Sequence, residues 1–428
     1  MKAVMYGGGN IGRGFIGQLF SQSGYQVTFI DVVDAVVDTL NREHKYPVRI
    51  LSNNGHKDLE VTNVSAVHGN HTEAVADAIA DADIMATAVG ARILKFIVPN
   101  IVAGLRKRWA MGKAPLNIII CENLMDANKV LEGMLKDQLT EEEKVRFDET
   151  VGLVEASIGR MVPVQTEEMK DGDPMRVCVE SYGFLPVDKD AFKGEIPQIG
   201  GMVPFAPFDF YIKRKLYIHN MGHATCAYLG DLLGLQSIYQ AIDVADIRII
   251  VENAMLESAA ALSKTYGVEL GSIVCHIEDL LYRFTNKALQ DTCARVGGDP
   301  ARKLSRQDRL IGSAKTVTVQ NCYNIGQVNA GTYTGKLVGY LVANDLVFAN
   351  TYFDKEAPTR NQPIGSFQSC AGITGLTNAE LTAESFVETL NANLAEGYSA
   401  WEYGEDKIAR LSVFEETAKL DIFMASIE

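Results

Sequence analysis

The chain has 428 residues, 47% hydrophobic and 22% charged, an ordinary composition for a globular protein and enough for two or more domains, each with a core. A formal net charge of −14 argues against non-specific binding of nucleic acid, and no apolar run is long enough to cross a membrane. Seven cysteines without a C-x-x-C pair indicate reduced thiols, and with no signal peptide expected before the first strand we predict a cytoplasmic protein.

The chain opens with a short apolar strand, predicted at residues 1–6, and a glycine-rich turn. Residues 7–12 read Gly-Gly-Gly-Asn-Ile-Gly, which fits G-x-G-x-x-G, and apolar residues then recur at helical spacing. In such a turn Gly7 permits the tight bend, Gly9 lets a pyrophosphate approach the backbone, and Gly12 lets strand and helix pack closely. The predicted cofactor contacts in the turn are Gly7, Gly9, Asn10, Ile11 and Gly12.

A second strand is predicted at residues 25–30, and Asp31 ends it. Dinucleotide-binding units place an acidic residue there, about 20 residues after the glycines. A carboxylate at this point accepts hydrogen bonds from the adenosine ribose hydroxyls and repels a 2′-phosphate, so NAD is predicted rather than NADP. The alternative is a structural glycine turn followed by a chance acid.

Strands and helices then alternate through the first half of the chain. The predicted helices lie at 33–42, at 72–81 and before the basic segment 106–108, and the predicted strands lie within 46–67, which has a turn at 53–55, and at 84–88, 116–121, 151–154 and 176–179. This alternation predicts a mostly parallel, doubly wound, Rossmann-like α/β sheet.

Beyond about residue 200 the pattern becomes helical. Long helical windows cover 206–232, 241–265, 268–285 and 379–396, and the segment 186–204 is rich in proline and glycine. We therefore predict an NAD-binding domain at 1–200 and a mainly α-helical substrate and catalytic domain at 201–428. Residues 313–375 have weak periodicity and are interpreted as a possible insertion.

Two further strand ends are expected to carry function, because ligands bind outside the carboxyl ends of the strands in such sheets. Thr87, Ala88 and Val89 end one strand and are predicted to lie along the cofactor. Asn123 follows the next strand and is predicted to contact the cofactor and to offer an amide N–H to a reacting oxygen. The alternative for Asn123 is an ordinary turn residue.

The richest group of polar residues is Lys215, Asn220 and His223. At about 100° per residue, Lys215 and His223 lie about 80° apart around a helix and Asn220 about 60° from His223, so all three fit one broad face. A desolvated lysine with a lowered pKa can take a hydroxyl proton, an asparagine amide can hold a developing alkoxide, and a histidine can orient a substrate hydroxyl. The alternative is a basic amphipathic helix with a satisfied buried histidine.

Two other motifs are rejected. The pair Tyr211 and Lys215 matches the Y-x-x-x-K of short-chain dehydrogenases, but the position thirteen residues earlier is Gln198 rather than serine, and the chain is too long. His68 and His71 lie in a polar loop without a nearby cysteine or acidic cluster, so no metal site is predicted.

The glycine turn, continued as Arg-Gly-Phe-Ile-Gly to residue 17, resembles the opening of the polyol-specific long-chain dehydrogenases of the mannitol dehydrogenase family, in particular of members that act on mannitol 1-phosphate. Further segments agree, so that the resemblance covers about residues 1–312; they are 87–90, 115–123, 213–216, 222–224, 227–230, 302–305 and 308–311. The resemblance implies NAD-dependent oxidation of an alcohol without a metal ion.

The family signature K-x-x-x-x-N-x-x-H falls on Lys215, Asn220 and His223. By this resemblance Lys215 is the general base, and Asn123 and Asn220 stabilise the oxyanion. The chain departs from the family at Gly159, where an aspartate usually precedes the arginine, and in the segment 313–375.

The expected reaction interconverts mannitol 1-phosphate and fructose 6-phosphate, and the basic residues proposed to bind substrate are Arg160, Arg302, Lys303 and Arg309. A hexuronate reductase or a mannitol 2-dehydrogenase is the alternative among enzymes, and an NAD-binding redox sensor is the alternative without catalysis. A small polyol or sugar phosphate is the expected partner, with no nucleic acid or membrane, and the chain is expected to be a monomer or a weak homo-oligomer.

Overall fold

The computed structural model describes residues 1–124, 126–305, 308–310, 312–313, 318–320, 323–324, 347–349, 351–356, 372–392, 400–404 and 407–411. The chain divides into two compact units, Met1–Lys303 and Leu304–Glu428, and each is described by itself. This division lies farther along the chain than the one predicted after residue 200, so the helices that follow residue 208 share a unit with the N-terminal sheet.

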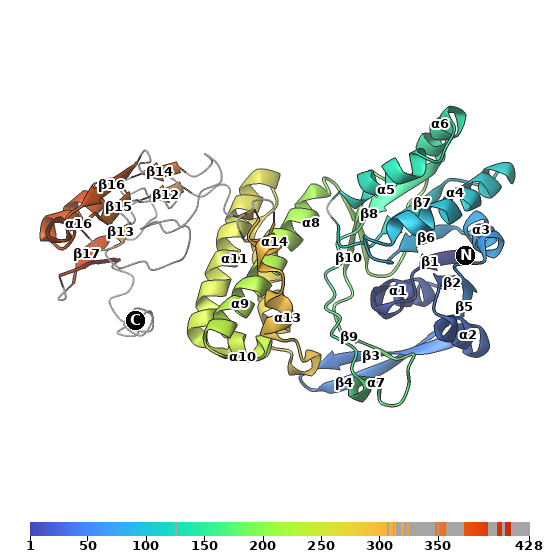
Figure 1. The fold of residues 1–428 in the computed structure, drawn as a ribbon, viewed down its shortest axis with the longest axis horizontal. Helices are drawn as coiled ribbons and strands as arrows, with labels where there is room; N and C mark the ends of the chain where they lie inside the picture. Colours follow the sequence, from blue (N-terminus) through green and yellow to red (C-terminus); the bar gives the residue numbers. More distant parts are fainter. Residues whose placement is uncertain are drawn as a thin grey trace. The chain divides into compact units, whose positions relative to one another are not determined.

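The first unit is built on a sheet of six parallel strands in the order β5-β2-β1-β6-β7-β8 (Figure 1). Its strands are β1 (Lys2–Tyr6), β2 (Gln26–Asp31), β5 (Val64–His68), β6 (Ile84–Thr87), β7 (Leu116–Ile120) and β8 (Val151–Glu155). The chain starts in the middle of the sheet, winds to one edge and returns to build the other half. The predicted doubly wound sheet is confirmed.

Helices cover both faces of this sheet (Figure 1); they are α1 (Gly17–Gln22), α2 (Asp34–Glu43), α3 (Thr72–Asp81), α4 (Leu94–Ala110), α5 (Ala127–Lys136) and α6 (Glu141–Thr150). Phe20 of α1 and Leu40 of α2 are buried in one core against one face. Ile79 of α3, Leu105 of α4 and Leu131 of α5 are buried in a second core against the other face. Successive strand residues alternate between these two cores, as the period of a strand requires.

A second sheet lies beside the first and explains the long β-region predicted at 46–67. Strands β3 (Lys45–Ser52) and β4 (Gly55–Thr62) form an antiparallel hairpin, and β9 (Val177–Glu180) pairs parallel with β3. A Cβ atom on Gly14 would lie 2.7 Å from Cγ1 of Val177, so this sheet packs directly on the glycine-turn helix. The unit also contains α7 (Glu167–Lys170) and the parallel pair β10 (Leu185–Asp188) and β11 (Met202–Phe205).

The remainder of the first unit is helical, as predicted. Its elements are α8 (Asp209–Arg214), the π-helical segment η2 (Lys215–Asn220), α9 (Met221–Leu232), α10 (Ile238–Asp243), α11 (Ala245–Tyr266), α12 (Leu270–Phe284), η3 (Lys287–Leu289), α13 (Cys293–Gly297) and α14 (Pro300–Lys303). A Cβ atom on Gly222 would lie 2.6 Å from Sδ of Met255, so only glycine allows α9 and α11 to approach this closely. Gly267, at φ +66°, ends α11 in the left-handed conformation.

The described part of the second unit combines short strands with two short helices. Its elements are β12 (Thr318–Gln320), β13 (Tyr323–Asn324), β14 (Val347–Ala349), β15 (Thr351–Asp354), β16 (Ile373–Leu376), α15 (Asn378–Leu381), α16 (Glu384–Asn391), β17 (Trp401–Tyr403) and β18 (Ala409–Leu411). Strands β12 and β14 pair in parallel, and so do β13, β15 and β16. The helical window predicted at 379–396 contains α15 and α16, and much of the possible insertion 313–375 lies outside the described residues.

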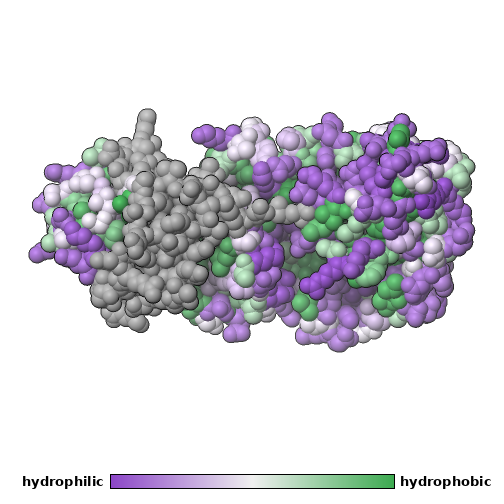
Figure 2. All heavy atoms as spheres, turned by 45° about the horizontal axis from the view of Figure 1, so that its top comes forward, coloured by the Kyte–Doolittle hydropathy of each residue, from purple (hydrophilic) through white to green (hydrophobic). Residues whose placement is uncertain are grey.

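Hydrophilic side chains cover much of the face of the first unit seen in Figure 2, with smaller hydrophobic areas between them. Within the described ranges, no helix has both the length and the apolar character needed to span a bilayer.

Candidate active site

The glycine turn between β1 and α1 has the geometry that its sequence predicts. Gly7 adopts φ +103°, and a Cβ atom there would lie 2.5 Å from the Ala88 carbonyl oxygen. A Cβ atom on Gly12 would overlap the Gly7 carbonyl oxygen. A Cβ atom on Gly9 would meet no atom within 4 Å, so this side of the turn is open to a ligand. The helix that follows begins as the π-helical segment η1 (Gly12–Ile16), and Asn10 and Ile11 immediately precede it.

Asp31, at the carboxyl end of β2, is held against the same turn. Its Oδ2 accepts a hydrogen bond from the Gly8 amide at 2.7 Å, and its Oδ1 accepts one from the Val33 amide at 3.0 Å. The carboxylate is therefore fixed in orientation beside the glycines, where the predicted contact with a ribose requires it.

Arg13 braces the turn and was not assigned a role from the sequence. It is buried, its Nε donates to the Gly8 carbonyl at 2.6 Å, and its Nη1 donates to the Met175 carbonyl at 2.6 Å. Its own carbonyl accepts from the buried Tyr46 hydroxyl at 2.7 Å. The cation thus ties the glycine turn to the second sheet, and the only sequence signal for it is its position inside the glycine motif.

The end of β6 lies against the turn. The Ala88 amide donates to the Tyr6 carbonyl at 2.9 Å. The next two amides, of Val89 and Gly90, donate to the two carboxylate oxygens of buried Glu122 at 2.9 and 2.7 Å. Asn123, the next residue, is exposed. Sequence reasoning missed Glu122, although an acidic residue directly after a buried apolar strand is a usable signal.

Thr87 is fully buried at the end of β6, and among the described residues its Oγ1 has no hydrogen-bond partner. A buried hydroxyl is normally satisfied, so an unpaired one at the carboxyl edge of the sheet fits a bound ligand. With the open face of Gly9 and the fixed carboxylate of Asp31, the residues present fit a dinucleotide cofactor.

Lys215, the first residue of η2, lines the same pocket as Ser157, which follows β8, the neighbour of β7 in the sheet. Burial raises the pKa of the Cys121 thiol, Glu122 raises it further, and the Lys215 ammonium lowers it. The preceding helix α8 is attached at the end of β8, because the Ser157 hydroxyl donates to the Tyr211 carbonyl at 3.5 Å.

A small pocket adjoins Lys215, and it is lined by Ser157, Gly159, Tyr182, Pro186, Arg214, Lys215, His219 and His276. Burial, with a contribution from Arg283, lowers the pKa of His219 well below its ordinary value. Burial, followed by Arg214 and Arg283, lowers the pKa of His276 to about 2. Both imidazoles are therefore neutral at pH 7, and the charged groups lining this pocket are the two cations Arg214 and Lys215.

His223 lies outside this lining. Its ring stacks on Phe284 at 4.7 Å between centroids, and its Nε2 lies 3.3 Å from Asp291 Oδ2 without forming a hydrogen bond among the described residues. The π-helical turns of η2 contain more residues than α-helical turns, so the angles expected at 100° per residue do not apply between Lys215 and Asn220. His219 takes the position beside Lys215 instead, and the catalytic role of His223 stays a prediction.

The four basic residues predicted to bind substrate lie in different places. Arg160 is buried, where its Nη1 donates to the Gly14 carbonyl and to Gln18 Oε1, each at 2.8 Å, and its Nε donates to the Tyr182 carbonyl. The Nζ of Lys303 donates to the Val296 carbonyl at 2.6 Å. Arg302 is exposed and pairs with Asp299 at 2.8 Å. Arg309 belongs to the second unit and pairs with Asp308 at 2.7 Å. Their contacts with substrate stay predictions.

Arg214 was not proposed from the sequence. Its guanidinium carbon lies 4.4 Å from the centroid of the Tyr211 ring, 5.9 Å from that of Phe210 and 6.0 Å from that of Phe184. A guanidinium beside aromatic rings keeps several N–H donors, which suit a planar or tetrahedral anion. The run of cations at 213–215 was the available signal. Phe210 and Tyr211 lie on the same helix as Arg214, and only Phe184 comes from a separate segment.

A buried ion pair joins the helical region to the second sheet. Arg283 of α12 donates through Nε to Glu180 Oε2 of β9 at 2.8 Å, and both side chains are less than 10% exposed. The guanidinium also lies 4.1 Å from the centroid of the Tyr182 ring. The pair thus holds α12 beside the pocket at Lys215.

We expect Arg283→Met to lower the free energy of unfolding by about 3–5 kcal/mol, because the variant leaves the Glu180 carboxylate buried without its partner. Urea denaturation followed by circular dichroism measures this loss. The double variant Glu180→Gln with Arg283→Met removes both charges and should recover part of it. Equal losses in the single and double variants would contradict this account.

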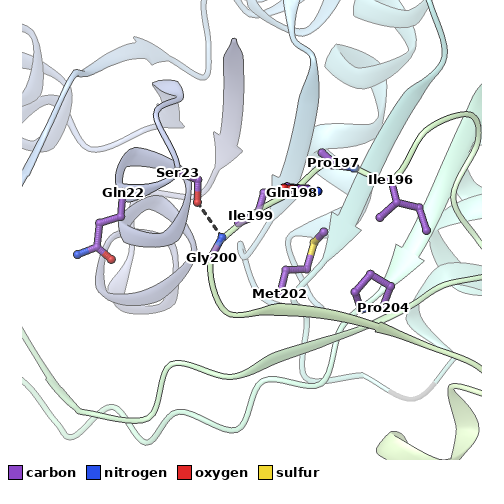
Figure 3. Close-up of a pocket in the computed structure, with 9 residues that line it drawn as sticks. All are labelled: Gln22, Ser23, Ile196, Pro197, Gln198, Ile199, Gly200, Met202 and Pro204. Atoms are coloured by element: carbon purple, nitrogen blue, oxygen red, sulfur yellow. Dashed lines mark hydrogen bonds between the residues drawn. The ribbon is translucent and has the colours of Figure 1, made fainter.

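A surface hollow lies at the carboxyl end of α1, the opposite end from the glycine turn (Figure 3). The Gly200 amide donates to Ser23 Oγ at its edge, at 2.9 Å. This hollow therefore does not adjoin the carboxyl ends of the strands, where the predicted cofactor and catalytic residues lie.

Comparisons with known proteins identify the family of the chain. Residues 1–201 match the model of the mannitol dehydrogenase Rossmann domain, and residues 208–324 match that of the mannitol dehydrogenase C-terminal domain. A D-sorbitol dehydrogenase structure in substrate-free form is 16% identical, with a TM-score of 0.64, over 73% of this chain and 75% of that one. The mannitol 2-dehydrogenase of Pseudomonas fluorescens, in complex with NAD and D-mannitol, is 15% identical, with a TM-score of 0.57, over 69% of this chain and 71% of that one. At these identities the two structures show a shared fold, and the family models show that the chain belongs to the mannitol dehydrogenase family, the NAD-dependent oxidoreductases that act on the CH–OH groups of polyols.

Proposed function

We propose that this protein oxidises mannitol 1-phosphate to fructose 6-phosphate with NAD, and catalyses the reverse reduction, in the cytoplasm. The observation that carries the proposal is the pocket beside Lys215, which lies near the carboxyl end of β8 and contains Arg214. NAD, held by the glycine turn and Asp31, would supply the acceptor for the hydride of the carbinol carbon, and one proton would be released.

Lys215 is the proposed general base, which takes the hydroxyl proton as the C–H bond breaks. Asn123, beyond the end of β7, and Asn220, at the end of η2, are the proposed amide donors that stabilise the developing alkoxide. Neutral His219 lines the pocket beside Lys215 and is placed to hydrogen-bond a substrate hydroxyl without adding charge.

The charge of the pocket favours an anionic substrate. Among the described residues, its lining has two cations, Arg214 and Lys215, and no carboxylate. A guanidinium binds phosphate or carboxylate through paired hydrogen bonds, whereas a neutral polyol gains less from it. The charge of this lining favours a phosphorylated ketose, a hexuronate is the second candidate on the same observation, and free mannitol is the least favoured.

The test is oxidation of NADH, followed by absorbance, with fructose 6-phosphate, fructose, fructuronate and tagaturonate in parallel. Turnover confined to fructose 6-phosphate supports the proposal. Turnover confined to a uronate or to fructose would show that this compound, and not fructose 6-phosphate, is the substrate. The proposed role of Lys215 would be unaffected. Binding of NADH without turnover on any of the four favours the redox sensor.

We expect Arg214→Gln to raise the KM for fructose 6-phosphate by about tenfold to a hundredfold, since a charge-assisted contact with the phosphate is lost. Arg302→Gln is the matched control, because it removes the same charge from an exposed residue of α14 that pairs with Asp299. Steady-state kinetics at saturating NADH give both values. An increase in KM for Arg302→Gln alone would favour Arg302, as predicted from the sequence, over Arg214 as the residue that binds the phosphate.

A further inference from the structure

The carboxylate of Glu122 connects the ends of two strands of the main sheet. Glu122 comes directly after β7 and Cys121, and its two oxygens accept hydrogen bonds from Val89 and Gly90, which follow β6. The side chain is only 8% exposed. Two adjacent backbone amides and one carboxylate therefore form a closed, part-buried contact.

The segment that Glu122 holds lies against the glycine turn. A Cβ atom on Gly7 would lie 2.5 Å from the Ala88 carbonyl oxygen and 3.2 Å from Val89 Cγ1, so residues 88–90 have little room to move on that side. Glu122 holds them on the other side. Because the two are joined, a shift of residues 88–90 would also move Asn123, the residue after Glu122.

We propose that Glu122 is a positioning residue that sets the cofactor-facing segment 88–90 and the Asn123 amide in one fixed arrangement. The proposal rests on the proposed function only for the role of Asn123. The expected effect of Glu122 on cofactor binding rests on its carboxylate contacts and on the position of residues 88–90 and Glu122 at the carboxyl edge of β6 and β7.

A carboxylate suits this position and an amide does not. Two neighbouring N–H groups need two acceptors, and an ionised carboxylate has them. A glutamine has one acceptor oxygen, and its NH2 group would face a second donor. One part-buried backbone amide would then face an N–H donor and lose its partner, a cost that a movement of the segment relieves.

The arrangement also predicts which half of the cofactor is affected. In doubly wound sheets the two halves of the strand order each bind one mononucleotide. Asp31 and the glycine turn belong to the half that contains β1 and β2, whereas β6 and β7 belong to the other. Loss of the Glu122 contacts should therefore weaken the binding of NADH. The binding of AMP, a probe of the adenosine half, should be nearly unaffected.

The experiment titrates full-length wild type, Glu122→Gln and Glu122→Asp with NADH and with AMP, using cofactor fluorescence and its displacement. Glu122→Gln should raise the dissociation constant of NADH by about tenfold or more, and Glu122→Asp, which is too short to reach both amides, by a smaller factor. The AMP constant should stay within about twofold of wild type in both. Glu149→Gln removes the same charge from an exposed residue at the end of α6 and should change neither constant.

An NADH constant that stays at the wild-type value in folded Glu122→Gln would overturn the proposal. Equal weakening of NADH and AMP would also overturn it, because a general loss of structure weakens both. If Glu122→Gln does not fold, the dissociation constants of Glu122→Asp for NADH and AMP test the proposal by the same two criteria. These titrations need no substrate, so an absence of turnover in the wild type would count against the proposed reaction and not against the positioning role.

Discussion

Lys215→Ala should lower kcat for the reduction of fructose 6-phosphate by about a thousandfold while the dissociation constant of NADH stays within about twofold of wild type. The reason is the place of Lys215 at the start of η2, in the lining of the pocket and outside the residues predicted to contact the cofactor. Removal of the proton acceptor affects the chemical step, whereas the proposed cofactor contacts stay intact. Stopped-flow measurement of NADH oxidation separates the two quantities.

The neighbouring lysine is the matched control for this variant. Lys213 pairs with Asp209 at 2.8 Å and lies over the Tyr266 ring, so Lys213→Ala removes the same charge two residues away without entering the pocket. It should keep turnover near the wild-type value. Similar turnover in Lys215→Ala and Lys213→Ala would remove Lys215 from the mechanism.

Two alanine substitutions in the glycine turn should both weaken NADH binding strongly but differ in stability. In Gly12→Ala the new Cβ atom overlaps the Gly7 carbonyl oxygen, so the turn itself must shift and the free protein loses stability. In Gly9→Ala the Cβ atom enters open space, so the free protein should unfold at the wild-type temperature. NADH should still bind about tenfold or more weakly, because the methyl group occupies the space through which a pyrophosphate approaches.

Thermal unfolding without ligand and fluorescence titration with NADH measure the two effects. Gly133→Ala on α5 is the control, since a Cβ atom there also meets open space and alanine is favoured in a helix. It should bind NADH normally and unfold at the wild-type temperature or slightly above. Normal NADH binding by Gly9→Ala would mean that the phosphates do not approach this face of the turn.

Local patterns were sufficient for the elements of the main sheet. The helix predicted at 72–81 is α3 with the same ends, and the strand predicted before Asp31 is β2. The period of apolar residues and the turn residues that bound them are properties of neighbouring positions, so they can be recognised without knowing the fold. The glycine turn was predictable for the same reason, because its constraints act within a few residues.

Pairing between distant segments was not predictable in this way. The strand predicted at 176–179 joins β3 in the second sheet rather than the main sheet, because Gly14 leaves room for Val177 and Val179 on the glycine-turn helix. The role of Arg160 in substrate binding stays a prediction, and no sequence pattern indicated that its guanidinium donates to Gly14, Gln18 and Tyr182. Each of these contacts joins residues far apart in the chain, and no local period reports them.

The sequence by itself determined the parallel sheet, the dinucleotide turn with its acidic partner, and the lysine beside which catalysis is proposed, since each depends on spacing within one segment. The tertiary structure alone decided which side chains surround that lysine. It placed His219 and Arg214 rather than His223 in the pocket, because η2 is π-helical and because α8, α12 and the end of β8 meet there. It also brought Glu122 onto the amides after β6, since neighbouring parallel strands end at the same edge of the sheet.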